Sequence, residues 1–214
     1  VWFGTEGSGV SRFDGNQFVT FTARDGLFGD SVYSIFQDPD SVMWFGTERG
    51  VSRFDGKTFV NFGREVGLDD ARVSAICRDA DGALWFGTDA GLARYDEKTF
   101  VTLSTADGLA HNSVISMSAA PDGIVWLGTG GGGLSRYDGK QFSNFSSQNG
   151  LGGDWVSSIL CDPDGRVWIG TGMAHPRNVS SVITTRIGLL TPAPRRTLTP
   201  TTPSLPRVSP SSAI

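Results

Sequence analysis

Paired aspartates followed by glycine are residues that could bind a metal ion. They occur as Asp-Ala-Asp-Gly at 79–82 and Asp-Pro-Asp-Gly at 162–165, with Asp-Pro-Asp-Ser at 38–41 as a variant. Clustered carboxylates bind Ca²⁺, but the longer ligand array and the distant glutamate of an EF-hand loop are missing from these segments. Asp and Gly are also the residues that a tight β-hairpin requires. We therefore interpret the segments as turns and predict no metal site.

Four arginines recur at almost equal spacing, and each lies two residues before an aspartate. In a β-strand, residues two apart share one face, so each Arg and its Asp would point the same way. The column could be taken for an anion site, but a ligand site is seldom repeated in every unit of a repeat protein. We interpret the pairs as structural Arg–carboxylate contacts. The pairs are Arg12 with Asp14, Arg53 with Asp55, Arg94 with Asp96, and Arg136 with Asp138.

The other chemically suggestive residues do not form a catalytic or cofactor-binding motif. The glycine run at 130–133 has neither the lysine nor the following helix of a phosphate-binding P-loop. The two histidines, His111 and His175, are too few for a zinc site or a histidine-centred triad. No nucleophile–base pair is recognisable. The sequence thus predicts a chain that is not an enzyme, with no catalytic residue and no cofactor.

All of these residues belong to a sequence pattern that is repeated along the chain, and this pattern determines where they lie in the fold. Five tryptophans recur at spacings of 42, 41, 41 and 42 residues, and each is followed two positions later by Gly-Thr. Arginine, phenylalanine, Gly-Leu and valine columns keep the same register. Repeats of this length are typical of β-propeller blades. The tryptophans are Trp2, Trp44, Trp85, Trp126 and Trp168.

Each repeat contains four short segments with the composition of β-strands. In one copy they are residues 73–78, 83–88, 92–95 and 99–103, here called strands A, B, C and D. They are rich in β-branched and aromatic residues and are separated by Gly, Asp and Pro. No helical periodicity competes with this interpretation. The fold class predicted is all-β, a β-propeller fragment of four-stranded antiparallel blades.

The chain is predicted to contain three complete blades and two partial ones. The complete blades cover about 32–62, 73–103 and 114–145. Strands B to D of one partial blade precede them, and strands A and B of another follow. We expect an open arc of blades rather than a closed ring, so residues 156–160 should not pair with residues 1–21.

The segment LWFGTDAGLARYDEKTFVTLSTADGL at 84–109, with its sister copies, resembles the two-component regulator propeller repeat. The resemblance covers residues 1–171. It implies the sensory ectodomain of a bacterial hybrid histidine kinase or a related signalling protein, in the periplasm or outside the cell. It also implies that further propeller blades and a signalling output domain belong to a longer parent chain. No kinase nucleotide-binding motif and no receiver-type acidic cluster occur in this sequence.

Residues 172–214 break the repeat and are predicted to form a second region. They hold seven of the ten prolines, no aromatic residue, and five arginines without any Asp, Glu or Lys. Such a segment cannot build a core. We expect either a disordered Pro/Thr/Ser/Arg-rich tail or a stretch read out of frame. The chain starts at Val1 without a signal peptide, which indicates truncation at the N-terminus.

Charge, hydropathy and cysteine content restrict the partners. The net charge is -4, and the first 171 residues carry 13 basic and 22 acidic groups, which argues against nucleic acid. No run of about 18 apolar residues occurs, so we expect no membrane insertion of this chain. Cys77 and Cys161 differ by one position in the repeat register and are expected to be free and mostly buried, on opposite sheet faces.

The loops that join strand D to strand A and strand B to strand C are the least regular parts of each repeat. In a propeller these loops converge at one end of the central channel, and irregular loops on a regular scaffold commonly carry function. Trp155 lies there, where the other copies have Ser31, Arg72 and Ser113. We expect this loop face to bind a small molecule, a glycan or a protein. The candidate residues are Glu6, Glu48, Asp69, Asp70, Arg72, Asp89, His111, Asn112 and Trp155.

The predicted function is therefore an extracytoplasmic sensory or ligand-recognition module of a two-component-type protein. One alternative is a propeller-type lyase or hydrolase, which two or more carboxylates or a histidine converging at the channel mouth would favour. The other alternative is a passive protein-interaction scaffold, which an exposed apolar patch of several hundred Å² would favour.

Overall fold

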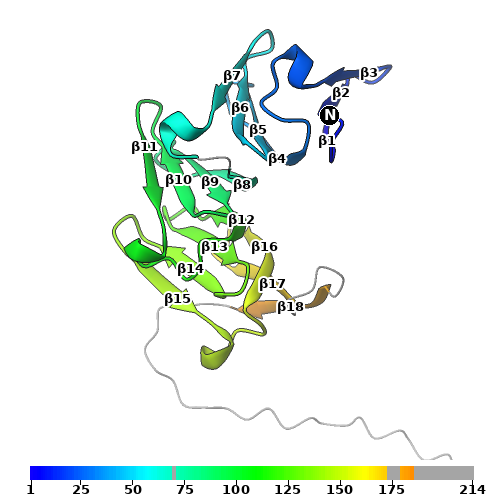
Figure 1. Ribbon diagram of the computed structural model, residues 1–214. Helices are drawn as coiled ribbons and strands as arrows, with labels where there is room; N and C mark the ends of the chain where they lie inside the picture. The colour runs from blue at the N-terminus through cyan, green and yellow to red at the C-terminus, as the bar shows by residue number, and fades with distance from the viewer. Residues whose placement is uncertain (69–70, 173–178, 186–214) are drawn as a thin grey trace, which may run out of the picture.

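The computed structural model describes residues 1–68, 71–172 and 179–185, the last segment as backbone only. The described residues form antiparallel β-sheets that follow one another along the chain (Figure 1). Three of the sheets have four strands, and the first and last have three. The all-β fold with four-stranded antiparallel blades is thereby confirmed.

Strand bounds agree with the repeat. The first sheet contains β1 (Trp2–Gly4), β2 (Val10–Phe13) and β3 (Phe18–Phe21). The second contains β4 (Val32–Gln37), β5 (Met43–Thr47), β6 (Gly50–Phe54) and β7 (Phe59–Phe62). The third contains β8 (Val73–Arg78), β9 (Leu84–Thr88), β10 (Leu92–Tyr95) and β11 (Phe100–Leu103). The fourth contains β12 (Val114–Ala119), β13 (Val125–Thr129), β14 (Leu134–Tyr137) and β15 (Phe142–Phe145), and the fifth contains β16 (Trp155–Cys161), β17 (Val167–Gly172) and β18 (Val179–Thr185).

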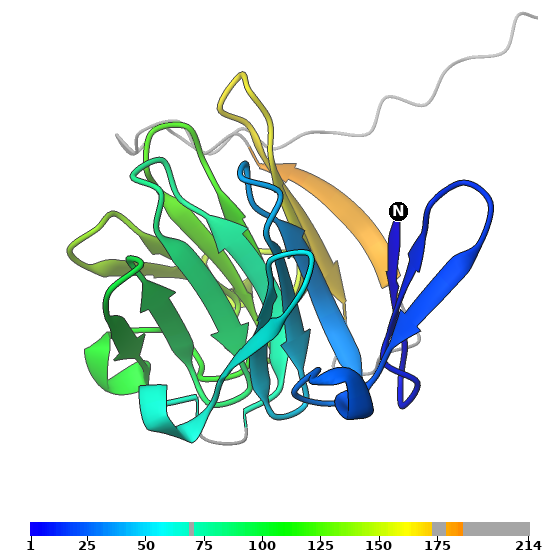
Figure 2. The ribbon, with the colours of Figure 1, turned by 90° about the horizontal axis from the view of Figure 1, so that it is seen from above.

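The blades form an open arc. Strand A of each blade contacts strand A of the next, since β4 contacts β8, β8 contacts β12, and β12 contacts β16. At the ends of the arc, among the described strands, β16 forms a ladder with β17 alone and β1 forms one with β2 alone. Figure 2 shows the first blade, in dark blue, as a hairpin-like sheet of its own beside the second. The open arc predicted from the sequence is confirmed, and no pairing joins residues 156–160 to residues 1–21.

The fifth blade contains one strand more than the sequence predicts. β18 pairs antiparallel with β17, from Val167 opposite Thr185 to Gly172 opposite Val179. The expectation of a disordered segment from residue 172 therefore differs from the structure over 179–185. Five of those seven residues are Val, Ile or β-branched Thr, which favour the extended backbone and can complete the free edge of strand B. The rest of the tail, 173–178 and 186–214, lies outside the described residues.

The apolar core lies between blades. One cluster combines Trp44 and Val51 of the second blade with Val73, Leu84 and Phe86 of the third, and all five are at most 3% exposed. Equivalent clusters join the first blade to the second, the third to the fourth and the fourth to the fifth. A single blade of this composition would leave one apolar face in water, so each blade depends on its neighbour for stability.

The glycine of strand B permits the blades to approach closely. A Cβ atom on Gly87 would lie 2.6 Å from Cγ1 of Val114, the first residue of the next strand A. Real Cβ atoms are not found at such distances from a neighbouring carbon, so only glycine fits. The same Gly–Val contact recurs at each junction: Gly4 with Val32, Gly46 with Val73, Gly87 with Val114, and Gly128 with Val156.

The arginine column is structural, but its partner differs from the prediction. Arg94 lies directly opposite Trp85 in the antiparallel ladder, with its guanidinium carbon 5.7 Å from the centre of the indole ring. Its Nε is 3.9 Å from the carboxylate of Asp79. Asp96, the expected partner, instead accepts the backbone N–H groups of Lys98 and Thr99 in its own turn. The cross-strand register, rather than the spacing of two along one strand, decides which groups meet.

The Asp-Ala-Asp-Gly segment forms a turn, as predicted. One oxygen of Asp79 accepts the backbone N–H of Asp81 and of Ala83, at 3.1 and 2.8 Å. The other oxygen accepts the indole N–H of Trp85 at 2.7 Å. This single carboxylate therefore closes the hairpin and also fixes the tryptophan that fills the blade interface.

Both cysteines are free thiols. Cys77 is buried, and burial, with smaller contributions from Asp79 and Cys161, raises the pKa of its thiol to about 12. Cys161 is half-buried, and burial raises the pKa of its thiol too. Thiols held neutral in this way are poor nucleophiles, consistent with a packing role.

Replacement of Gly87 by Ala should destabilise the arc, because the added methyl group overlaps Val114 of the next blade. We expect a loss of about 1–3 kcal/mol in the free energy of unfolding, measured by urea denaturation. The control is the double variant Gly87→Ala/Val114→Ala, whose loss should be smaller than the sum of the two single losses. Additive losses would show that the two residues are not in contact.

The turn aspartates should make the protein sensitive to acid. The N–H groups of Thr99 and Lys98 hold the pKa of Asp96 below its ordinary value of 3.8. Because the pKa is lower in the folded state, the stabilising contribution is complete above the unfolded value and is lost as pH falls through the folded value. Thermal melts from about pH 6 to pH 2 should show a smaller acid-dependent decrease of Tm for Asp96→Asn than for the unaltered chain. Identical slopes would contradict this assignment.

Candidate functional site

The loops between strand D and the next strand A lie together at one end of the sheets. Figure 2 shows the helices of the loops at 23–25, 64–66 and 105–107 along the lower edge of the arc, and each of the four loops contains one such short 3-10 helix. They are η1 (Ala23–Asp25), η2 (Arg64–Val66), η3 (Thr105–Asp107) and η4 (Ser147–Asn149). A glycine with left-handed backbone ends each helix, which is why Gly-Leu recurs in the sequence. This end of the molecule is the loop face.

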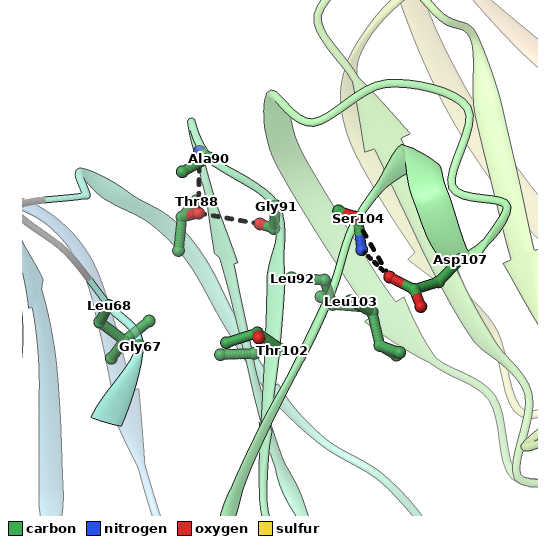
Figure 3. A pocket seen from close by; sticks show the side chains of 11 residues that line it. Gly67, Leu68, Thr88, Ala90, Gly91, Leu92, Thr102, Leu103, Ser104 and Asp107 are labelled. Atoms are coloured by element: carbon green, nitrogen blue, oxygen red, sulfur yellow. Dashed lines mark hydrogen bonds between the residues drawn. The ribbon is translucent and has the colours of Figure 1, made fainter. Parts of the chain in front are cut away.

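A pocket of about 220 Å³ opens on the loop face between two blades (Figure 3). Its polar groups already have partners. Thr88 Oγ1 donates to the carbonyl of Gly91 and accepts the N–H of Ala90, and the carboxylate of Asp107 accepts the N–H of Ser104. The pocket therefore offers few free hydrogen-bonding groups to a ligand, and we regard it as part of the scaffold.

Four of the candidate residues hold the loops in place. The carboxylate of Glu48 accepts the N–H of Ser31 at 3.0 Å, and that of Asp89 accepts the N–H of Arg72 at 3.1 Å. His111 Nδ1 accepts the N–H of Ser113 at 3.0 Å. Asn112 Oδ1 accepts the N–H of Thr105 at 2.8 Å, the position at which Asp30 and Asp154 serve the other loops. These contacts fix the loop backbones.

Arg72 stands apart from these four because its guanidinium faces an aromatic ring. Its terminal carbon lies 5.3 Å from the ring centre of Tyr33, which belongs to strand A of the preceding blade. Both side chains are exposed, and Tyr33 is 42% exposed. A cation beside an exposed aromatic ring at strand A occurs at this one of the positions before the leading valine, and the repeat does not require it.

Sequence reasoning missed Tyr33. In the other copies the residue after the leading valine of strand A is Ser74, Ile115 or Ser157, so an aromatic residue there is off-pattern. The same comparison that singles out Trp155 would have found it. Aromatic residues are so frequent in the strands that this departure was not conspicuous.

Trp155 lies in a strand rather than in a loop, which corrects the prediction. It is the first residue of β16, is paired with Gly172, forms an isolated bridge with Gly130, and is half-buried. The strand starts one residue earlier than β12 because these two glycine backbones provide partners for it. Ser31, Arg72, Ser113 and Trp155 take equivalent positions, one in each blade, immediately before the valine of strand A, and we call them the mouth row.

The remaining candidates add little to the site. Glu6 is exposed in the loop between β1 and β2. Asp69 and Asp70 lie outside the described residues. The structure therefore places Arg72 beside Tyr33 and Trp155 at the equivalent position two blades further along, while the other described candidates either support loops or stand alone.

The geometry of the loop face suits binding more than catalysis. Glu48 and Asp89 each accept a backbone N–H from the loop that leads into strand A of their own blade. His111 Nδ1 accepts a backbone N–H from its own loop. Within the described part of the chain, no three His, Cys, Asp or Glu residues are grouped as metal ligands. In the same part, no helix is long and apolar enough to cross a membrane.

The repeat matches a family model at four places along the chain. Residues 26–49, 67–90, 108–131 and 150–173 match the model described as "Two component regulator propeller". Each match starts at the glycine that ends a 3-10 helix and runs through strands A and B of one blade. The chain is built from two-component regulator propeller repeats. The resemblance stated from the sequence is confirmed.

Several solved structures share this fold. One described as the extracellular domain of a hybrid two-component system from B. thetaiotaomicron is 24% identical, with a TM-score of 0.69 over 88% of this chain and 27% of that one. A second such domain from the same organism is 23% identical, with a TM-score of 0.67 over 79% and 24%. Virginiamycin B lyase from Staphylococcus aureus is 17% identical, with a TM-score of 0.52 over 64% and 48%.

These likenesses show the fold alone. The chain spans about a quarter of the length of the two extracellular domains and about half of the lyase. Comparison with curated protein sequences gave no match.

Truncation of two tryptophans of these repeats should lower stability to very different extents. Trp85 is 2% exposed between two blades, so Trp85→Ala leaves a cavity and should cost about 3–5 kcal/mol in the free energy of unfolding. Trp155 is half-buried at the start of its strand, so Trp155→Ala should cost far less, about 1 kcal/mol. Chemical denaturation of both variants measures the difference. Equal losses would make Trp155 a core residue and remove it from the site.

Proposed function

We propose that this chain is part of an extracytoplasmic sensory propeller that recognises its ligand at the mouth row. The observation that carries the proposal is the exposed Arg72–Tyr33 pair, 5.3 Å apart, on a face where the carboxylates of Glu48 and Asp89 are used by the scaffold. The strands around this pair follow the same pattern in every blade. Folding therefore does not require Arg72 and Tyr33 at these positions, and another reason is needed for their presence. Ligand recognition supplies one.

The side chains of the site indicate the kind of ligand. A guanidinium binds carboxylate, sulfate or phosphate groups with directional hydrogen bonds. The Tyr33 and Trp155 rings offer apolar faces for a sugar ring or a planar group, and tryptophan and arginine are frequent anchors of protein interfaces. A small molecule, a glycan or a protein segment that carries an anionic group would satisfy both features.

Further blades and an output domain are the proposed partners within a longer parent protein. Two of the structures similar to this chain are described as extracellular domains of hybrid two-component systems, and each is about four times as long as the segment matched. A periplasmic or extracellular location follows by analogy with them. The proposal includes no catalytic step, because the described carboxylates and His111 do not converge.

The test is a thermal-shift screen of the chain against oligosaccharides and small anionic metabolites. A ligand of the mouth row should raise Tm, because binding only to the folded state stabilises it. Arg72→Ala and Trp155→Ala should each weaken that shift. Lys98→Ala, which removes an exposed cation from the turn between β10 and β11 at the other end of the blade, is the matched control. A ligand whose shift is unaffected by Arg72→Ala would move the site elsewhere.

A further inference from the structure

In the third blade, one carboxylate contacts two other side chains. Asp79 accepts the indole N–H of Trp85 at 2.7 Å and lies 3.9 Å from Nε of Arg94. Arg94 in turn lies over the face of the Trp85 ring. The aspartate, the tryptophan and the arginine form a compact unit in which one anion satisfies two donors.

The fourth blade keeps both donors and lacks the acceptor. Ala120 replaces the aspartate, while Trp126 and Arg136 occupy the positions of Trp85 and Arg94 and face each other in the ladder. Among the described residues, no acceptor within hydrogen-bonding distance replaces the missing carboxylate for either donor. Arg136 does lower the pKa of Asp138, but that carboxylate is bound by the N–H groups of Gln141 and Lys140 in its own turn.

The space left by the missing carboxylate is open to a ligand. Ala120, Trp126 and Arg136 all line a crevice of about 890 Å³ between the fourth and fifth blades. Phe145 of β15 and Val167 of β17 form apolar walls on either side. Trp126 is 4% exposed and lines this crevice, so its unpaired indole N–H can donate to a group that is bound there.

The corresponding crevice between the second and third blades is smaller and more acidic. It measures about 390 Å³ and is lined by Asp38, Asp40 and Glu97 together with Trp44 and Arg53. There Asp38 is bound by Arg78 of the next blade, and the buried Trp44 indole N–H has no partner among the described residues. Three carboxylates make that crevice unsuitable for an anion, so the fourth blade differs from it in charge as well as in size.

We propose that the crevice between the fourth and fifth blades is a second binding site, specific for a carboxylate. The ligand carboxylate takes the place of the missing aspartate, accepts the Trp126 indole N–H and pairs with the Arg136 guanidinium. The remainder of a small ligand lies against Phe145 and Val167. This site is on the side of the blades near the turns between strands A and B, away from the mouth row, and it does not depend on the function proposed there.

Two acidic residues at the edge of the crevice set the strength of this site. Asp164 is 75% exposed and lies 3.6 Å from Arg166, and Asp122 is exposed and accepts the N–H of Ile124. Their negative charge opposes an incoming anion, although solvent and Arg166 screen it. Binding of a simple monocarboxylate should therefore be weak and should decrease at high salt.

The experiment uses the whole chain and acetate as the probe at neutral pH. Sodium acetate should raise Tm above the value in sodium chloride of equal ionic strength, and it should shift the indole N–H resonance of Trp126 in a proton–nitrogen correlation spectrum. Arg136→Gln should abolish both responses. Arg94→Gln in the third blade, whose aspartate is present, is the matched control and should leave the Trp126 shift in place.

Ala120→Asp is the decisive variant. The introduced carboxylate should reproduce the contacts of Asp79, raise Tm without acetate, and abolish the response to acetate. An acetate response of equal size in Ala120→Asp would overturn the proposal, as would an unaltered chain that gives no response by either measurement. Arg72→Ala should not change any of these results, which separates this site from the mouth row.

Discussion

The close approach of neighbouring blades at the strand-B glycine is the constraint on which the rest of the structure depends. A Cβ atom at Gly87 would lie 2.6 Å from Val114, and the other three junctions have the same arrangement. At this separation the indole ring of one blade and the aromatic or branched residue of the next can share one dry layer. The tryptophan column, the meander of strands and the curvature of the arc all follow from this spacing.

The polar residues divide into those that repeat and those that do not. Repeated carboxylates such as Asp79 and Asp96 close turns through backbone N–H groups, and side chains such as Glu48 and Asn112 fix the loops. Their hydrogen-bonding groups are therefore occupied and are not available to bind a ligand. The informative positions are those at which one blade departs from its sisters, either by gaining a group, as at Arg72, or by losing one, as at Ala120.

Much of the fold could be predicted from the sequence because a repeat supplies several independent copies of each pattern. Strand positions, the turn role of Asp79 and the open arc followed from composition and spacing. The partner of Arg94 did not, because it is set by the register between strands rather than by spacing within one. Trp155 and β18 were misplaced for a related reason, since their pairing depends on the backbone of Gly130 or of strand β17. Tyr33 was overlooked, although the alignment of the copies contained the signal.

In the described part of the chain, the main strand contacts of each blade are with the blades next to it along the sequence. The second, third and fourth blades are covered on both faces, whereas the first and fifth have a neighbour on one face only. Opening should therefore be graded, starting at the two ends and reaching the middle last, instead of occurring in a single concerted step. Arg72 joins the third blade to Tyr33 of the second, within the part that opens last. A ligand bound there would restrain the flanking blades and reduce the amplitude of the motion by which the arc opens.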